Sequence, residues 1–169
     1  VFPAGPLREP LLPQLARASA LVIIGDGPRG EAVAEAAATA DVEVLTARMR
    51  ARADAPDLSG RAVVAFCGIA RPEKFYASLE AAGATIKARC AFGDHHPYSA
   101  RDVARILDLA AGNDGALPIT TEKDLVRLNE TNDPGAGLRG KLQTLPIQVV
   151  FNEPERLDAL LGAAMRAKL

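Results

Sequence analysis

The stretch Ala62-Val-Val-Ala-Phe-Cys67, followed by Gly68-Ile-Ala-Arg-Pro72, decides the fold. Its first six residues form a continuous apolar run, which is typical of a strand buried on both faces of a parallel sheet. The glycine ends this strand, and the proline suits the first turn of a helix. Apolar side chains then recur at helical spacing as far as Gly83, a natural stop. The stretch therefore predicts a strand followed by a loop and a helix.

The same alternation of strand and helix continues in both directions along the chain. Strands are expected at residues 20–24, 42–45, 62–67, 84–92, 117–120 and 146–151, with an exposed continuation at 48–52. Helices are expected at residues 11–18, 31–39, 72–83, 99–110, 121–128 and 152–165. This order predicts an α/β fold, a Rossmann-like and mostly parallel sheet with helices on both faces.

The composition excludes several classes of protein. The 169 residues fit one domain, and a net charge of −1 argues against a nucleic-acid partner. Cys67 and Cys90 lie at predicted strand ends and are expected to be buried free thiols. No Cys or His spacing suits structural zinc, and no apolar run approaches the roughly 18 residues of a membrane span. The chain begins with Val1 in a proline-rich segment, so we expect it to be part of a longer protein.

The segment Phe92-Gly-Asp-His-His-Pro-Tyr98 contains both histidines of the chain. It follows a predicted strand and precedes a helix start, where open α/β sheets usually bind ligands. Asp94 beside His95 could fix the imidazole tautomer and raise its basicity for proton transfer. The alternative is a turn of Asp, Gly and Pro that exposes two inactive histidines.

Two further loops suit an anion. Thr121-Glu-Lys-Asp124 predicts a capped helix, on which Lys123 and Arg127 share one face near the free amides of the N-terminus. The alternative is an ordinary cap followed by a solvated basic face. Arg71, at the start of the helix after residues 62–67, suits an anion in the same way, or marks only a strand-to-helix turn.

The motif Gly25-x-Gly27-x-x-Gly30 has the form of a dinucleotide-binding fingerprint, with Glu43 as the acidic residue further on. Pro28 lacks an amide that should face the pyrophosphate, and Asp26 places a negative charge there. The alternative is a turn that needs glycines for its geometry. The phosphate loop G-x-x-x-x-G-K-[ST] does not occur in the sequence.

Four segments together resemble the tetraacyldisaccharide 4′-kinase family, the lipid A 4′-kinases of Gram-negative bacteria. They occur in the family's order and are residues Pro3 to Pro10, Gly68 to Phe75, Phe92 to Tyr98 and Thr121 to Leu128.

The resemblance implies transfer of the ATP γ-phosphate to the 4′-hydroxyl of tetraacyldisaccharide 1-phosphate, on the cytoplasmic face of the inner membrane. In the family, an N-terminal lobe binds ATP and Mg²⁺ through a phosphate loop, and carries a catalytic Asp and a membrane-associating helix. Residues 1–18 would continue from that lobe, and residues 19–169 would form the C-terminal α/β lobe. The expected partners are the lipid, the N-terminal lobe and, for the full-length protein, a membrane surface. This chain alone is expected to be soluble and inactive.

The resemblance also assigns residues. His95 matches the family's loop histidine, which works with the absent Asp to activate the sugar hydroxyl, and Asp94 would orient its ring. Charge and position, and not the resemblance, make Lys123, Arg127, Thr121, Arg71 and His96 the candidate substrate- or phosphate-binding side chains. Two other hypotheses remain, a dinucleotide-binding domain that uses Gly25, Gly27, Gly30 and Glu43, and a non-catalytic module that docks through an apolar patch at residues 1–12.

Overall fold

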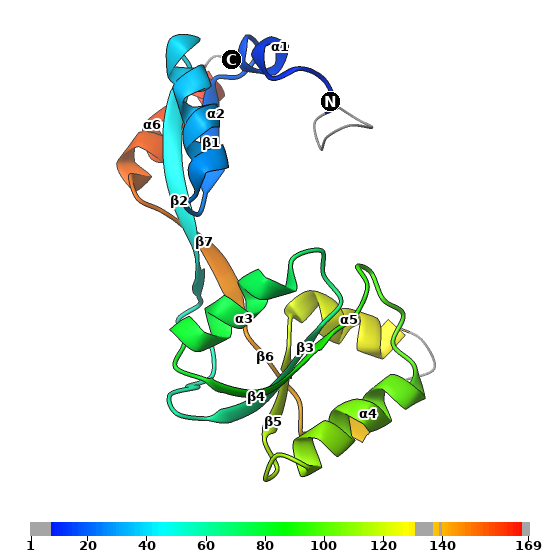
Figure 1. Ribbon diagram of the computed structural model, residues 1–169. Helices are drawn as coiled ribbons and strands as arrows, with labels where there is room; N and C mark the ends of the chain where they lie inside the picture. The colour runs from blue at the N-terminus through cyan, green and yellow to red at the C-terminus, as the bar shows by residue number, and fades with distance from the viewer. Residues whose placement is uncertain (1–7, 131–136, 139, 167–169) are drawn as a thin grey trace. The chain divides into compact units, whose positions relative to one another are not determined.

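The computed structural model describes residues 8–130, 137–138 and 140–166, coloured in Figure 1. Contacts divide the chain into two compact units. Unit 1 consists of Val1–Arg50 and Val149–Leu169, and unit 2 of Ala51–Gln148. The expected division into residues 1–18 and 19–169 remains a prediction, and most of the proposed patch at residues 1–12 lies outside the described residues.

Unit 2 is built on a parallel sheet of four strands in the order β4-β3-β5-β6. The strands are β3 (Ala62–Cys67), β4 (Thr85–Ala91), β5 (Leu117–Thr120) and β6 (Gln143–Thr144). The helices are α3 (Pro72–Ala81), α4 (Ala100–Ala111) and α5 (Glu122–Glu130). The predicted α/β class with a mostly parallel sheet is confirmed. The strand β6 was not expected, because two residues are too few to show a period.

The central strand β3 is buried on both faces, which explains its unbroken apolar sequence. Val63, Ala65 and Cys67 pack with the apolar side of α3, whereas Phe66 packs with α4 and α5 on the opposite face. Helices therefore cover both faces, as predicted. Phe66 is the partner of Cys90 in the ladder, so Cys67 and Cys90 point to opposite faces. Both are buried free thiols, as expected.

The strand order creates a switch point in unit 2. From β3 the chain passes through α3 to β4 on one side, and from β5 it passes through α5 to β6 on the other. The loops that leave the neighbouring strands β3 and β5 therefore diverge. In such sheets the carboxyl ends of the two diverging strands border the usual ligand-binding crevice.

Unit 1 contains a second, smaller sheet with the strand order β1-β2-β7. Its strands are β1 (Ala20–Ile24), β2 (Glu43–Ala51) and β7 (Ile147–Phe151), and its helices are α1 (Leu11–Leu15), α2 (Pro28–Thr39) and α6 (Pro154–Arg166). The pair β1 and β2 is parallel. The two strand segments expected at 42–45 and 48–52 form the single strand β2, and α1 is shorter than predicted. Periodicity identifies strands but not their partners, so the presence of two sheets was not foreseen.

The helices within the described ranges are too short or too polar to cross a bilayer.

Candidate functional site

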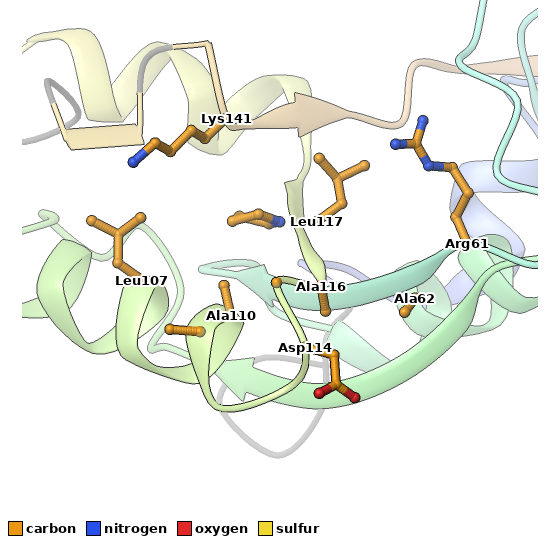
Figure 2. A pocket seen from close by; sticks show the side chains of 11 residues that line it. Arg61, Ala62, Leu107, Ala110, Asp114, Ala116, Leu117 and Lys141 are labelled. Carbon is orange, nitrogen blue, oxygen red and sulfur yellow. The ribbon is translucent and has the colours of Figure 1, made fainter.

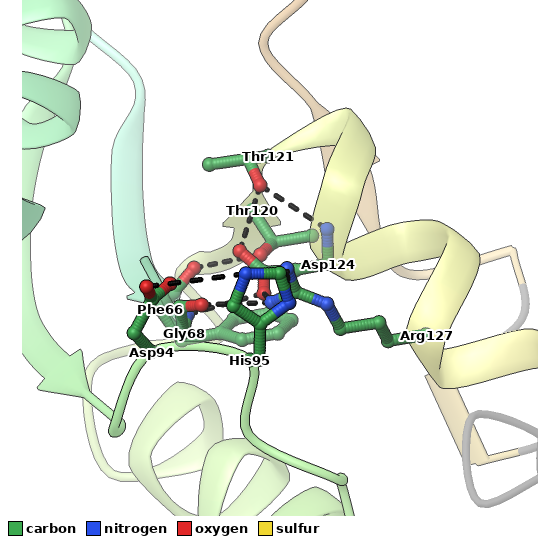
Figure 3. Close-up of polar contacts among 8 residues, drawn as sticks. All are labelled: Phe66, Gly68, Asp94, His95, Thr120, Thr121, Asp124 and Arg127. Carbon is green, nitrogen blue, oxygen red and sulfur yellow. Dashed lines mark hydrogen bonds and ion pairs between the residues drawn. The ribbon is translucent and has the colours of Figure 1, made fainter. Parts of the chain in front are cut away.

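Three loops meet at the carboxyl ends of β3, β4 and β5 (Figure 3). They contribute Gly68, the pair Asp94 and His95, and the segment from Thr121, which precedes α5, to Arg127 in the last turn of that helix. The sequence indicated each loop separately as a candidate. The structure places them together at the switch point of the sheet.

Gly68 is the point of closest approach between the loops. Its amide donates a hydrogen bond to Asp124 Oδ1 at 3.1 Å. A β-carbon at Gly68 would lie 3.1 Å from the carbonyl oxygen of Gly93, 3.2 Å from Cβ of His96 and 3.3 Å from Asp124 Oδ1. Contacts this short are tighter than most β-carbon contacts, so a larger residue at Gly68 would require the other two loops to shift.

Asp124 is fully buried, and its carboxylate accepts hydrogen bonds from three different residues. Besides the Gly68 amide, it accepts hydrogen bonds from the Thr121 hydroxyl at 2.7 Å and from Arg127 Nη1 at 3.0 Å. Its own amide donates to Thr121 Oγ1 at 3.2 Å, which caps the helix as predicted. A buried carboxylate is tolerated when it is paired and hydrogen-bonded in this way. Asp124 therefore joins the start of α5 to the end of β3.

Arg127 turns inward from α5, and only 17% of its side chain is exposed. Nη1 donates to the carbonyl oxygen of Gly68 at 2.7 Å as well as to Asp124. Nη2 lies 3.3 Å from Nδ1 of His95. Lys123, which the sequence placed on the same helix face, is exposed. The structure thus brings Arg127 into the loop cluster and leaves Lys123 at the surface.

His95 extends from the cluster with 80% of its side chain exposed. Its backbone has φ of 58°, in the left-handed region that non-glycine residues seldom adopt, and its amide donates to the carbonyl oxygen of Gly68 at 3.1 Å. Asp94 Oδ2 lies 3.9 Å from Nε2, which is longer than a hydrogen bond. The polar group nearest to the ring is therefore Arg127.

His96 is built into the start of α4. Its Nε2 lies 3.1 Å from Asp102 Oδ2, and its ring stacks on Phe92 with centroids 4.6 Å apart. Asp102 also accepts hydrogen bonds from the amide and hydroxyl of Ser99, the predicted cap of α4. Burial opposes ionisation of Asp102, but the hydrogen bonds from Ser99 and His96 outweigh it and lower its pKa. This environment suits a structural role for His96.

Tyr98 and Arg71 lie outside the hydrogen-bond network of Asp124, Arg127 and His95. Tyr98 is buried, and its hydroxyl has no hydrogen-bond partner among the residues that the structure describes. Burial and the negative charge of Asp124 raise the pKa of Tyr98. Arg71 precedes α3 as its N-cap and is exposed. Neither side chain has a polar contact with His95 or Arg127 in the described part of the chain.

A pocket of about 590 Å³ lies at the other end of the sheet (Figure 2). Its lining includes Ala62 at the start of β3, Leu117 at the start of β5 and Ala110 near the end of α4. Arg61, Asp114 and Lys141 also line it. None of the residues singled out from the sequence belongs to it. The pocket is therefore separate from the loop cluster.

The glycine motif of unit 1 is explained by its turn. Gly25 and Gly27 have φ of 85° and 141°, and a β-carbon at Gly30 would lie 3.1 Å from Cγ2 of Ile23. Pro28 is the first residue of α2, and Glu43 is paired with Arg156 at 2.8 Å. The acidic residue required for a ribose is thus already engaged. These features do not favour a dinucleotide site.

Comparisons with known proteins agree on one family. A family model described as tetraacyldisaccharide-1-P 4′-kinase (LpxK) matches residues 1–166. The tetraacyldisaccharide 4′-kinase of Rhodospirillum centenum is 46% identical over 174 residues, covering 99% of this chain and 47% of that protein. The corresponding enzyme of Xanthobacter autotrophicus is 45% identical over 173 residues, covering 97% and 49%. The chain spans about half the length of these curated relatives.

A solved structure supports the fold. The LpxK of Aquifex aeolicus, crystallised as an "apo" form in complex with ATP, matches with a TM-score of 0.57. The match covers 96% of this chain and 47% of that chain, at 23% sequence identity.

Proposed function

Because the chain belongs to the tetraacyldisaccharide-1-P 4′-kinase family, we propose that it is the C-terminal half of a kinase of lipid A biosynthesis. The complete enzyme would transfer the γ-phosphate of ATP to the 4′-hydroxyl of tetraacyldisaccharide 1-phosphate, at the cytoplasmic face of the inner membrane. The match over residues 1–166 and the double length of the relatives support this proposal.

The observation that carries the proposal is the position of His95 at the switch point of the sheet. Its imidazole is exposed, while its backbone amide and its Nδ1 are held from within the cluster. A side chain anchored on one side and open on the other suits contact with a substrate that arrives from solvent. In this proposal His95 acts with an acidic residue of the other half of the enzyme to activate the sugar hydroxyl. Asp94 adds negative charge beside the ring.

Basic side chains of α5 and at the start of α3 would neutralise phosphate charge. Lys123 is exposed at the first turn of α5, where the helix dipole also favours anions. Thr121 immediately precedes α5 and Arg127 lies in its last turn, and both are hydrogen-bonded to Asp124, while Arg71 stands at the start of α3. We propose Lys123 and Arg71 as phosphate contacts, because both charged side chains are exposed.

The residues of this chain do not fit ATP and Mg²⁺. Within the described ranges, no group of three His, Cys, Asp or Glu side chains is placed to hold a metal ion. The sequence also lacks a G-x-x-x-x-G-K-[ST] loop. We therefore assign both to the other half of the enzyme, and we expect the chain alone to have no kinase activity.

The test is a kinase assay on a full-length protein that contains this chain. His95→Ala should lower kcat by roughly 10²- to 10⁴-fold, the usual contribution of a group that assists proton transfer, with a smaller effect on substrate binding. Lys87→Ala, an exposed cation on β4, is the matched control and should leave kcat unchanged. Normal turnover by the His95 variant would remove this residue from the mechanism. Calorimetry with NAD should give a flat trace, whereas measurable binding would revive the dinucleotide hypothesis.

A further inference from the structure

We propose that Arg127, itself fixed by Asp124, is a positioning residue that holds the His95 imidazole in the tautomer protonated on Nε2. His95 then offers an N–H donor on its exposed side, so it would assist proton transfer by holding the acidic residue of the other half, which itself accepts the hydroxyl proton. The inference rests on the proposed function for its catalytic meaning, but its structural content is independent of the reaction.

The tautomer follows from the chemistry of the two side chains. A guanidinium carries only hydrogen-bond donors and remains charged at every pH a protein experiences. Arg127 Nη2 lies 3.3 Å from His95 Nδ1, so Nδ1 must be the acceptor in this contact. The single proton of the neutral ring is then on Nε2.

Arg127 has little freedom to turn away. Nη1 donates to the carbonyl oxygen of Gly68 at 2.7 Å and to Asp124 at 3.0 Å. Asp124 has no exposed surface and is itself bound to the Gly68 amide and the Thr121 hydroxyl. Two oxygen atoms thus hold the guanidinium directly, and one of them belongs to a carboxylate that is itself fixed by two further hydrogen bonds (Figure 3).

The backbone of His95 is bound to the same place. Its amide donates to the carbonyl oxygen of Gly68, which also accepts from Arg127. With φ of 58° the residue adopts a conformation that persists only where its surroundings enforce it, and such conformations cluster at functional sites. Main chain and side chain of His95 are therefore oriented by one carbonyl group and one guanidinium.

The alternative holder of the ring is Asp94. Its Oδ2 is 3.9 Å from Nε2, too far for a hydrogen bond, and about half of its side chain is exposed. A carboxylate at this distance leaves the Nε2 proton available to an incoming acceptor. Asp94 lies nearer to Nε2 and Arg127 nearer to Nδ1. Substituting each residue separately therefore shows which of the two fixes the tautomer.

The test is ¹⁵N NMR spectroscopy of the two histidine rings in this chain, at a pH where both are neutral. The wild-type His95 should show Nε2 at the shift of a protonated nitrogen and Nδ1 at the shift of an unprotonated one. Arg127→Lys keeps a positive charge beside Asp124 but lacks the planar fork, so the two His95 shifts should move toward each other as the tautomers mix. His96, held by Asp102, is an internal reference that should not change.

Asp94→Asn is the matched control and should leave the His95 shifts as they are. Averaged shifts in the wild-type chain, a proton on Nδ1, or a response to Asp94→Asn but not to Arg127→Lys would overturn the inference. In the full-length enzyme, Arg127→Lys should lower kcat by up to about a hundredfold with little change in KM, as misplaced groups do. If the tautomer is fixed and His95→Ala still turns over normally, the proposed function fails while the positioning role stands.

Discussion

Removing the positive charge beside Asp124 should destabilise unit 2 more than removing the negative charge. Arg127→Met leaves a carboxylate with no exposed surface and no counter-charge. Breaking a buried ion pair in this way costs about 3–5 kcal/mol. Asp124→Asn leaves an arginine that is already 17% exposed and able to reach water, so its cost should be about 1–3 kcal/mol.

The double variant gives the sharper result. In Asp124→Asn with Arg127→Met, the amide oxygen can still accept from Gly68 and the amide group can donate to Thr121. No buried charge remains unpaired. The double variant should therefore be more stable than Arg127→Met alone, by about 1–3 kcal/mol, the size expected for side chains that share one network.

The assay is urea unfolding followed by tyrosine fluorescence. The chain has two tyrosines and no tryptophan, and Tyr76 and Tyr98 both belong to unit 2, so the signal reports this unit alone. The free energy of unfolding comes from the midpoint and slope of each transition. A cost below about 1 kcal/mol for Arg127→Met, or a double variant less stable than both single variants, would refute the reasoning.

Three further predictions concern the same unit. Gly68→Ala should lower the free energy of unfolding in urea by about 1–3 kcal/mol, because its β-carbon would press on the backbone of another loop. Gly93→Ala, with open space around the new β-carbon, should lower it by less than about 0.5 kcal/mol. Equal losses in the two variants would contradict the close approach at Gly68. Burial raises the pKa of Cys67 from 9.0 to about 11, so the unfolded thiol loses its proton first and the free energy of unfolding should fall between pH 9 and 11 by up to about 1.4 kcal/mol per pH unit. Unfolding at each pH should show a shallower fall in Cys67→Ala, and an unchanged slope would exclude the thiol as the cause. The hydrogen bonds from Ser99 and His96 hold the pKa of Asp102 below its ordinary value of 3.8, so its stabilisation is present above that pH and is lost as the pH falls through the folded pKa. Acid unfolding followed by circular dichroism should show a smaller loss of stability in Asp102→Asn, and the same loss in both proteins would disprove this prediction.

The sequence predicts those helices and strands of the fold that are determined by a few neighbouring residues. The apolar run of β3 and the Ser99 and Asp102 cap of α4 are local signals, and both appear in the structure. The separation of β1, β2 and β7 from the other strands depends on pairing between distant segments, which periodicity does not encode.

The site was predictable in its parts but not in its connections. The sequence indicated His95, Arg127 and the cap at Asp124 separately. That Asp124 is buried depends on the amide of Gly68, 56 residues earlier in the chain. Likewise, the direction of the Arg127 side chain depends on the carbonyl oxygen of Gly68 and the carboxylate of Asp124, which no local sequence pattern brings together. Such contacts arise from the order of strands in the sheet.

The two thiols on opposite faces of the sheet offer an experimental use. Cys67 lies in the layer between the sheet and α3, and Cys90 in the layer with α4 and α5. A buried thiol reacts with a labelling reagent only when its own layer opens. Labelling rates of the single-cysteine variants would therefore time the opening of each layer separately, without the introduction of any new cysteine.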